Sequence, residues 1–200
     1  MYLSRLLLNQ RNKQAMREAD DPYQLHRTLA RAFGERLEEA RVLFRVDRPE
    51  RSAPRVIVQS LVEPVWSKLP SGYASAEFKR FDLNVDPGTF LRFRLLARPA
   101  KRDKETGKRV SVRGDEALRS WLERKADAAG FQIKACAANE LRWRDTKGEK
   151  QSQALAAVQF DGVLVVTDPD KLREAVRSGI GPQKAYGFGL LSLAPEQVDL

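Results

Sequence analysis

The stretch LRFRLLAR, residues 91–98, is the clearest strand signal in the chain and begins the pattern that decides the fold. Its apolar residues alternate with largely basic ones, which is typical of a strand with one buried face. A loop over 99–109 follows it. The helical spacing of Leu118, Trp121 and Leu122 then predicts a helix over 115–129.

The segments that follow complete a βαββαβ order. Residues 131–136 and 141–144 are expected to be extended and to lead through a hairpin turn at Lys147-Gly148 into a strand that reaches 163–166. The pair Asp168-Pro169 opens a short helix to about residue 177, and residues 188–193 form a final apolar strand. This order predicts an α+β domain of the ferredoxin-like class, which RNA-recognition motifs share.

The first half of the chain follows the same order less regularly. The expected elements are strands at 2–8, 42–46, 55–62 and 73–81, a helix at 22–37 and a degraded second helix around Trp66 and Leu69. Pro87-Gly88 is a natural boundary. The chain is therefore expected to hold two tandem ferredoxin-like domains, over residues 1–87 and 88–200.

The only histidine of the chain, His26, lies near the start of the helix expected over 22–37, where Asp21 is a good N-cap and Pro22 a good first residue. At about 100° per residue, His26 falls at the border of the apolar stripe and shares a face with Tyr23. A histidine at such a border is usually structural. Proton transfer near neutral pH is the alternative that this spacing leaves open.

Composition narrows the class of protein. The formal net charge is +9, from 36 basic and 27 acidic residues, which favours a polyanionic partner such as a nucleic acid. The lone Cys136 excludes an intramolecular disulfide and fits a reducing cytoplasm. No apolar run is long enough to span a membrane or form a signal peptide. One histidine and one cysteine offer no zinc spacing, so we expect any catalysis to need neither metal nor cofactor.

Three groups of residues could contact phosphates. Basic side chains cluster between residues 92 and 113, recur on the expected hairpin, and accompany a glycine-rich string at 179–189 that lacks the pattern of a Walker loop. A solvated loop and a structural turn are the alternative interpretations of the first and the third group. The candidate residues are Arg94, Arg98, Lys101, Arg102, Lys108 and Arg109, then Arg142, Arg144 and Lys147, and finally Gly181, Lys184 and Gly187.

Three strings taken together resemble the CasE family, the CRISPR-associated endoribonucleases of the type I-E Cascade complex. They are DPYQLHR at 21–27, FRLLARPAK at 93–101 with GKRV at 107–110, and the ending from 179 to 195. The similarity runs in the same order from Met1 to Pro195. One departure is Arg98, where the Ala-Asn-Pro of relatives would place asparagine.

The resemblance implies tandem ferredoxin-like domains, recognition of a CRISPR repeat hairpin RNA, and a single metal-independent cut at the base of its stem. The implied products carry a 5′-hydroxyl and a 2′,3′-cyclic phosphate, and the implied partners are the retained guide RNA and other Cascade subunits. The family's active-site tyrosine and histidine correspond to Tyr23 and His26. Its glycine-rich loop corresponds to 179–189, and its stem-binding hairpin lies near 142–150.

This chemistry agrees with the residues present. Attack by the RNA 2′-hydroxyl needs one proton removed, one proton supplied and stabilisation of the phosphoryl charge. His26 can perform either proton transfer, and Tyr23 is better suited to orient the substrate or act as the acid. Arg27, Arg31 or Lys184 could hold the phosphate. A non-catalytic RNA-binding subunit, in which His26 only packs or stacks, and a basic DNA-binding or scaffold protein remain the alternatives.

Overall fold

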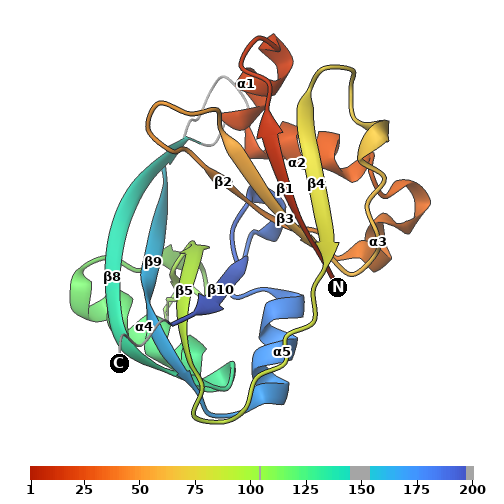
Figure 1. Ribbon diagram of the computed structural model, residues 1–200. Coiled ribbons are helices and arrows are strands. Elements are labelled where there is room, and N and C mark those ends of the chain that lie inside the picture. The colour runs from red at the N-terminus through yellow and green to blue at the C-terminus, as the bar shows by residue number, and fades with distance from the viewer. Residues whose placement is uncertain (104, 145–153, 197–200) are drawn as a thin grey trace. The chain divides into compact units, whose positions relative to one another are not determined.

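The computed structural model describes residues 1–103, 105–144 and 154–196, which pack into two compact units (Figure 1). The first unit contains residues 1–82 and 183–190, and the second contains 83–143, 154–182 and 191–196. Residues 183–190 therefore pack with the first unit although they follow most of the second in sequence. The proposed domain limits of 1–87 and 88–200 stay a prediction.

The first unit is built on a four-stranded sheet in the order β2-β3-β1-β4 (Figure 1). The first and third strands are central neighbours, which is the split βαβ arrangement of a ferredoxin-like fold. Neighbouring strands of this sheet run antiparallel. Its elements are β1 Tyr2–Leu8, α1 Lys13–Ala19, α2 Pro22–Ala30, η1 Gly34–Arg36, α3 Leu37–Ala40, β2 Leu43–Asp47, β3 Arg55–Ser60, η2 Trp66–Lys68, β4 Ala74–Arg80 and, from the returning segment, η3 Lys184–Tyr186.

The core of this unit lies between the sheet and its helices. Alternation along β1 buries Leu6 and Leu8 and leaves Arg5 exposed. Phe44 of β2 is in register with Val58 of β3 and packs in the same hydrophobic cluster. The apolar stripe of α2 completes this cluster, so the helix is held on one face of the sheet with a fixed rotation.

The helix predicted over 22–37 is shorter than expected. It ends at Ala30, where the chain tightens into turns such as Phe33 N–H to the Ala30 carbonyl, at 3.0 Å. Gly34 then takes a positive φ of 54°, which is incompatible with a continuing right-handed helix. The sequence pattern also failed to predict α1, whose seven residues are too few for a clear periodic signal.

The second unit repeats the fold with the strand order β10-β5-β9-β8 (Figure 1). Both helices of the βαββαβ pattern are present, so the predicted α+β class with two ferredoxin-like sheets is confirmed. The elements are β5 Phe90–Ala97, β6 Ala100–Arg102, β7 Arg109–Ser111, α4 Asp115–Ala128, β8 Phe131–Arg144, β9 Ala154–Val166, α5 Pro169–Ser178 and β10 Leu191–Pro195.

Aromatic packing fixes α4 on the second sheet. The rings of Trp121 on α4 and Phe160 on β9 are stacked with centroids 6.0 Å apart, and Leu95 is in register with Phe160. The segment 99–109, expected to be a loop, contains β6 and the start of β7, which pair as a short hairpin. The final strand begins at Leu191, because residues 188–190 belong to the first unit.

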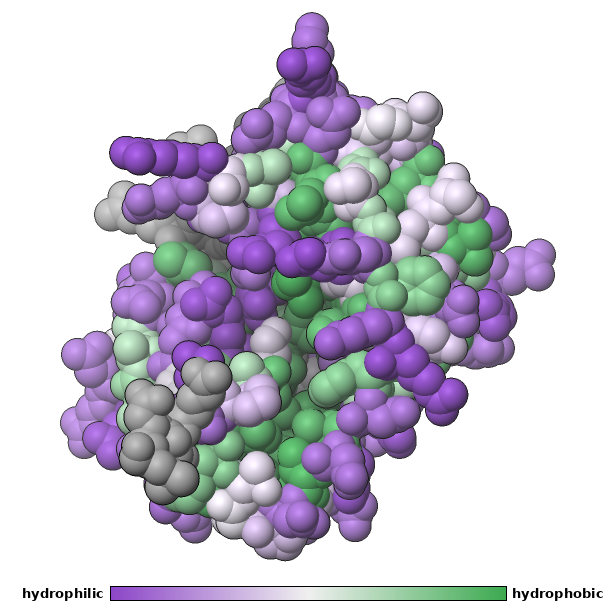
Figure 2. Space-filling model, in the orientation of Figure 1, coloured by the Kyte–Doolittle hydropathy of each residue, from purple (hydrophilic) through white to green (hydrophobic). Residues whose placement is uncertain are grey.

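The surface agrees with a chain in which 32% of residues are charged. Figure 2 shows hydrophilic side chains over most of the visible face, with hydrophobic ones lying between them. Among the residues that the structure describes, no helix is long and apolar enough to cross a membrane.

Candidate active site and nucleic-acid interface

The start of α2 fixes the positions of Tyr23 and His26. The Asp21 carboxylate accepts a hydrogen bond from the Gln24 backbone N–H at 3.1 Å, and Pro22 occupies the first turn, as the sequence predicted. Leu25 is fully buried, so the helix cannot rotate without exposing its apolar face. The two candidate catalytic side chains are therefore presented by a capped and packed helix.

His26 is half-buried and lies against Phe44 of β2. The two ring centroids are 6.0 Å apart with an interplanar angle of 31°. Desolvation by this burial lowers the pKa of His26 below its usual value of 6.5. The imidazole is therefore mainly neutral at neutral pH, which is the protonation state that a general base requires.

Tyr23 lies on the exposed side of the same helix. Its side chain is 37% exposed, and its ring centroid is 6.3 Å from that of Tyr186 in η3. The η3 turn contacts both α2 and β2. The structure thus brings the returning segment 183–190 to the helix that carries Tyr23 and His26.

A tight backbone turn holds η3 beside α2. Gln183 has a φ of 63° and Gly187 a φ of 80°, and the Gly187 N–H donates to the Lys184 carbonyl at 3.1 Å. A β-carbon at residue 187 would lie 3.2 Å from Phe44 Cε2, so glycine avoids crowding of that ring as well as strain at the positive φ. Lys184, in the same turn, is partly exposed.

The glycine-rich string predicted as one loop is divided between the two units. Gly181 belongs to the second unit, where its backbone lies near Trp121, and Gly187 belongs to the first. Only the part from Gln183 onward packs with the Tyr23 and His26 helix. The sequence indicated a backbone that could approach a phosphate, but not the point at which the chain passes from one unit to the other.

Arg27 follows Tyr23 and His26 in α2, Arg31 directly follows the end of this helix, and both are exposed. The Arg27 guanidinium donates from Nη1 to Gln24 Oε1 at 3.3 Å. Both arginines line a polar cavity shared with α1. Both residues therefore border the space between α1 and α2, beside the face that carries Tyr23 and His26.

The basic cluster of the second unit lies on the hairpin of β6 and β7. Lys101, Arg102, Lys108 and Arg109 are all exposed, and Arg102 is the direct cross-strand partner of Arg109. The Asp103 carboxylate accepts hydrogen bonds from Thr106, chiefly from its backbone N–H, and these bonds lower the pKa of Asp103. The hairpin therefore holds like charges together and exposes them to solvent.

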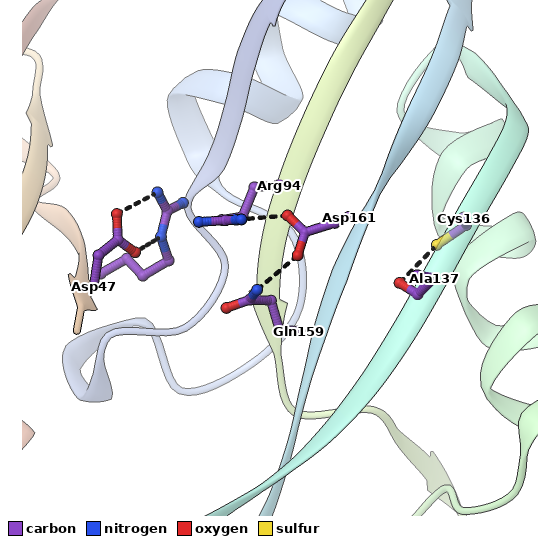
Figure 3. A network of polar contacts seen from close by, with 7 residues as sticks. Asp47, Arg94, Cys136, Ala137, Gln159 and Asp161 are labelled. Carbon is purple, nitrogen blue, oxygen red and sulfur yellow. Dashed lines mark hydrogen bonds and ion pairs between the residues drawn. The ribbon is translucent and has the colours of Figure 1, made fainter. Parts of the chain in front are cut away.

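Arg94 is engaged within the second sheet. Its Nε lies 2.5 Å from Asp161 Oδ1, and the second oxygen of Asp161 accepts from Gln159 Nε2 at 2.6 Å (Figure 3). A contact between Arg94 and RNA would have to share or break this ion pair. Arg98, directly after the end of β5, is partly buried.

The remaining predicted contacts cannot be placed at the level of side chains. Arg142 and Arg144 belong to β8, but only their backbone is described, and Lys147 lies outside the described residues. The expectation that this hairpin binds RNA stays a prediction. Across residues 1–103, 105–144 and 154–196, no three His, Cys, Asp or Glu side chains form a group that could hold a metal ion.

Cys136 is exposed, and its thiol donates to the Ala137 carbonyl at 3.4 Å (Figure 3). Desolvation, followed by the charge of Asp161, raises the pKa of this thiol to about 11. A protonated thiol is a poor nucleophile, so Cys136 is not suited to covalent catalysis.

Sequence reasoning missed three residues around the site. Phe44 was predicted only as part of a strand, Tyr186 only as part of the glycine-rich string, and Arg17 belongs to the helix that was not foreseen. The alternation of β2 marks Phe44 as a core residue, but contact with His26 depends on how α2 crosses the sheet. No local sequence signal reports such a crossing.

The whole chain is similar to known proteins. The model of a family described as "CRISPR associated protein" matches residues 1–195. The chain is 42% identical to the CRISPR-associated endoribonuclease Cse3 of Thermus thermophilus and 32% identical to the CRISPR system Cascade subunit CasE of Escherichia coli. Each alignment covers 98% of this chain and 100% of the relative.

A solved structure gives the same result. Thermus thermophilus Cse3, bound to an RNA representing a pre-cleavage complex, superposes with a TM-score of 0.90 at 38% identity. The superposition covers 97% of this chain and 98% of that chain. The similarity therefore extends over both units and not over one shared domain.

Proposed function

The chain belongs to the CasE family of CRISPR associated proteins, and on that premise we propose that it is an endoribonuclease that cuts the hairpin of a CRISPR repeat RNA. It retains the processed guide RNA and works as a subunit of a Cascade-type complex. We place this complex in the cytoplasm, where the single Cys136 stays reduced. The relatives named above support the activity and the partners.

The observation that carries the proposal is the shared presentation of Tyr23 and His26 by α2. His26 is desolvated against Phe44, and its lowered pKa supplies a neutral imidazole. Such a group can accept the proton of an RNA 2′-hydroxyl as that oxygen attacks the adjacent phosphorus. The bond from phosphorus to the 5′-oxygen then breaks, which leaves a 2′,3′-cyclic phosphate and a 5′-hydroxyl.

Tyr23 and Lys184 have complementary parts in this proposal. The Tyr23 hydroxyl is a neutral donor that can orient the phosphate or supply a proton to the departing 5′-oxygen. Lys184 lies in η3, the turn that contacts α2, and its ammonium would stabilise negative charge on the phosphoryl oxygens. We expect much of the rate to come from positioning, because the chain has only one histidine.

The packing of His26 on Phe44 also favours a second candidate, an RNA-binding subunit in which the imidazole is only structural. Both candidates predict tight binding of the hairpin, so the test must measure cleavage. We expect wild-type protein to cut a repeat hairpin RNA in excess EDTA, and His26→Ala to bind the RNA as tightly but to cut it only at a low residual rate. Intact RNA after incubation with folded wild-type protein would eliminate the enzyme proposal.

The reaction type has its own test. A hairpin with a 2′-deoxy nucleotide at the cut site should bind normally and resist cleavage, because it lacks the attacking oxygen. End-group analysis of the cut ribose substrate should find a 2′,3′-cyclic phosphate. Cleavage of the deoxy substrate would exclude attack by the 2′-hydroxyl and require another nucleophile.

A further inference from the structure

A polar cavity between α1 and α2 has no part in the proton transfers proposed above. Its volume is about 320 Å³, and it is lined by Arg17 from α1, by Arg27 from α2 and by Arg31, which directly follows the end of α2. Within the described ranges of the chain, none of these three guanidiniums forms an ion pair with a carboxylate. Three arginines therefore line one cavity, and none of them is paired with a carboxylate in the part of the chain that the structure describes.

The one acidic residue of the cavity is held by neutral donors. Glu18 is only 5% exposed, and its Oε2 accepts from the Tyr73 hydroxyl at 2.7 Å. Its Oε1 accepts from Gln14 Nε2 at 2.8 Å. The single carboxylate balances one of the three guanidinium charges, so the cavity remains positively charged.

The cavity is partly preorganised. Gln24, in the capped first turn of α2, accepts the hydrogen bond from Arg27 and so restricts its guanidinium. Preorganised, planar guanidiniums are well matched to the oxygens of a phosphate group.

The position of the cavity relates it to the candidate active site. Arg27 follows His26 directly and lies one helical turn after Tyr23, and Arg31 lies one turn further, about 6 Å along the axis. A chain that crosses the Tyr23 and His26 face of α2 can therefore continue over this cavity. The anion within reach of the cavity arginines is then a neighbouring phosphate of the same RNA strand.

We propose that this cavity binds a backbone phosphate of the substrate RNA next to the phosphate that is cut. The proposal rests on the function proposed above and adds Arg17, from a different helix, to the RNA-binding residues. The three arginines would fix the register of the strand, so that the 2′-hydroxyl of the right nucleotide faces His26. They act as positioning residues and do not contact the reacting atoms.

The test measures binding of an uncleavable hairpin, with a 2′-deoxy nucleotide at the cut site, as a function of salt. We expect Arg17→Gln to weaken binding about tenfold, as for loss of hydrogen bonds to a charged group. The slope of log K against log salt should also decrease by about 0.7 to 0.9, the value for one lost phosphate contact. Arg11→Gln, which removes the same charge from an exposed residue outside the cavity, should change neither quantity.

A second measurement locates the phosphate. Neutral methylphosphonates replace single phosphates along the hairpin, and binding is compared between wild type and Arg17→Gln. The replacement at the contacted phosphate should weaken binding by wild type more than binding by Arg17→Gln, because the variant has already lost one of the contacts to that phosphate. We expect this coupling at a phosphate adjacent to the cut site.

The outcomes separate the two proposals. If Arg17→Gln binds the RNA as tightly as Arg11→Gln, with both proteins folded by circular dichroism, the cavity does not bind RNA. Coupling found only at phosphates distant from the cut site would overturn its assignment as the adjacent subsite. Failure of the wild type to bind or cut the hairpin would instead reject the function proposed above.

Discussion

The backbone of Gly187 lies against the ring of Phe44, where a β-carbon at residue 187 would come within 3.2 Å of Cε2. The centroid of the same ring lies 6.0 Å from the centroid of the His26 imidazole. Phe44 is fully buried and cannot move away without disturbing the core of the first unit. One side chain, Phe44, therefore contacts both the η3 turn and His26, the candidate general base.

Gly187→Ala should damage both stability and cleavage. The positive φ of 80° disfavours any residue with a β-carbon by about 1–2 kcal/mol, and crowding of Phe44 adds about 1–3 kcal/mol. Urea unfolding and single-turnover cleavage measure the two effects. Gly88→Ala is the control, because Gly88 has a φ of 86° and a β-carbon added there would meet nothing within 4 Å. Equal losses in both variants would show that the Phe44 contact has no role.

Tyr23→Phe isolates the Tyr23 hydroxyl. The variant keeps the ring that faces Tyr186, so binding of hairpin RNA should change by less than a few-fold. The single-turnover cleavage rate should fall by about 100-fold, the lower end of the range for a proton-transferring or orienting group. Tyr2→Phe, on β1, removes a hydroxyl from a tyrosine without an assigned role and should cut at the wild-type rate. Unimpaired cleavage by Tyr23→Phe would remove its hydroxyl from the mechanism.

The pH dependence of cleavage tests the assignment of His26 as the base. Burial lowers the pKa of His26, so its neutral form persists below pH 6.5 in the free protein. With RNA in excess over protein and below its KM, the rate reports the free enzyme. It should fall toward acidic pH with a midpoint below pH 6.5. The residual cleavage by His26→Ala should lack this acidic limb. A midpoint above 6.5 in the wild type would contradict a desolvated base.

The fold was largely predictable from the sequence because each sheet has strong local signals. The alternation in β5, the periodicity of α4 and the Asp-Pro helix starts at Asp21 and Asp168 all appear in the structure. The secondary-structure predictions failed where packing between distant segments, and not the local sequence pattern, determines the backbone conformation. Ala32 and Phe33, beyond the end of α2, are buried, but turns and not a continued helix place them in the core.

The site was predictable only in its local part. Tyr23 and His26 share a helix, so their common face follows from helical geometry. The contacts from Phe44 and Tyr186 join segments far apart in the chain, and the sequence of α2 contains no information about them. The ion pair of Arg94 with Asp161 was hidden for the same reason, since 67 residues separate the partners.

The buried hydrogen bond from Tyr73 to Glu18 should contribute measurably to stability. Burial, and then the Glu18 carboxylate, raise the pKa of Tyr73, so its hydroxyl is a donor at neutral pH. Tyr73→Phe leaves Glu18 Oε2 without this donor and should lower the free energy of unfolding by about 1–3 kcal/mol. In a Glu18→Gln background the same change removes a bond to a neutral amide, so the loss measured by urea unfolding should be roughly half as large. Equal losses in the two backgrounds would mean that the carboxylate charge is unimportant.

The basic side chains of the hairpin formed by β6 and β7 should have opposite effects on protein stability and on RNA binding. Arg102 and Arg109 are cross-strand partners, and like charges in that position repel each other. Arg102→Gln should therefore leave the free energy of unfolding unchanged or slightly raised.

If the hairpin contacts the RNA backbone, the same variant should weaken binding several-fold and reduce the salt slope by about 0.7 to 0.9. Arg119→Gln is the control, since that side chain is 79% exposed and already paired with Glu123. Loss of binding accompanied by loss of stability would point to a structural role for Arg102. Unchanged binding of a stable protein would show that the hairpin charges are only solvated, because removal of a phosphate contact must change the salt dependence.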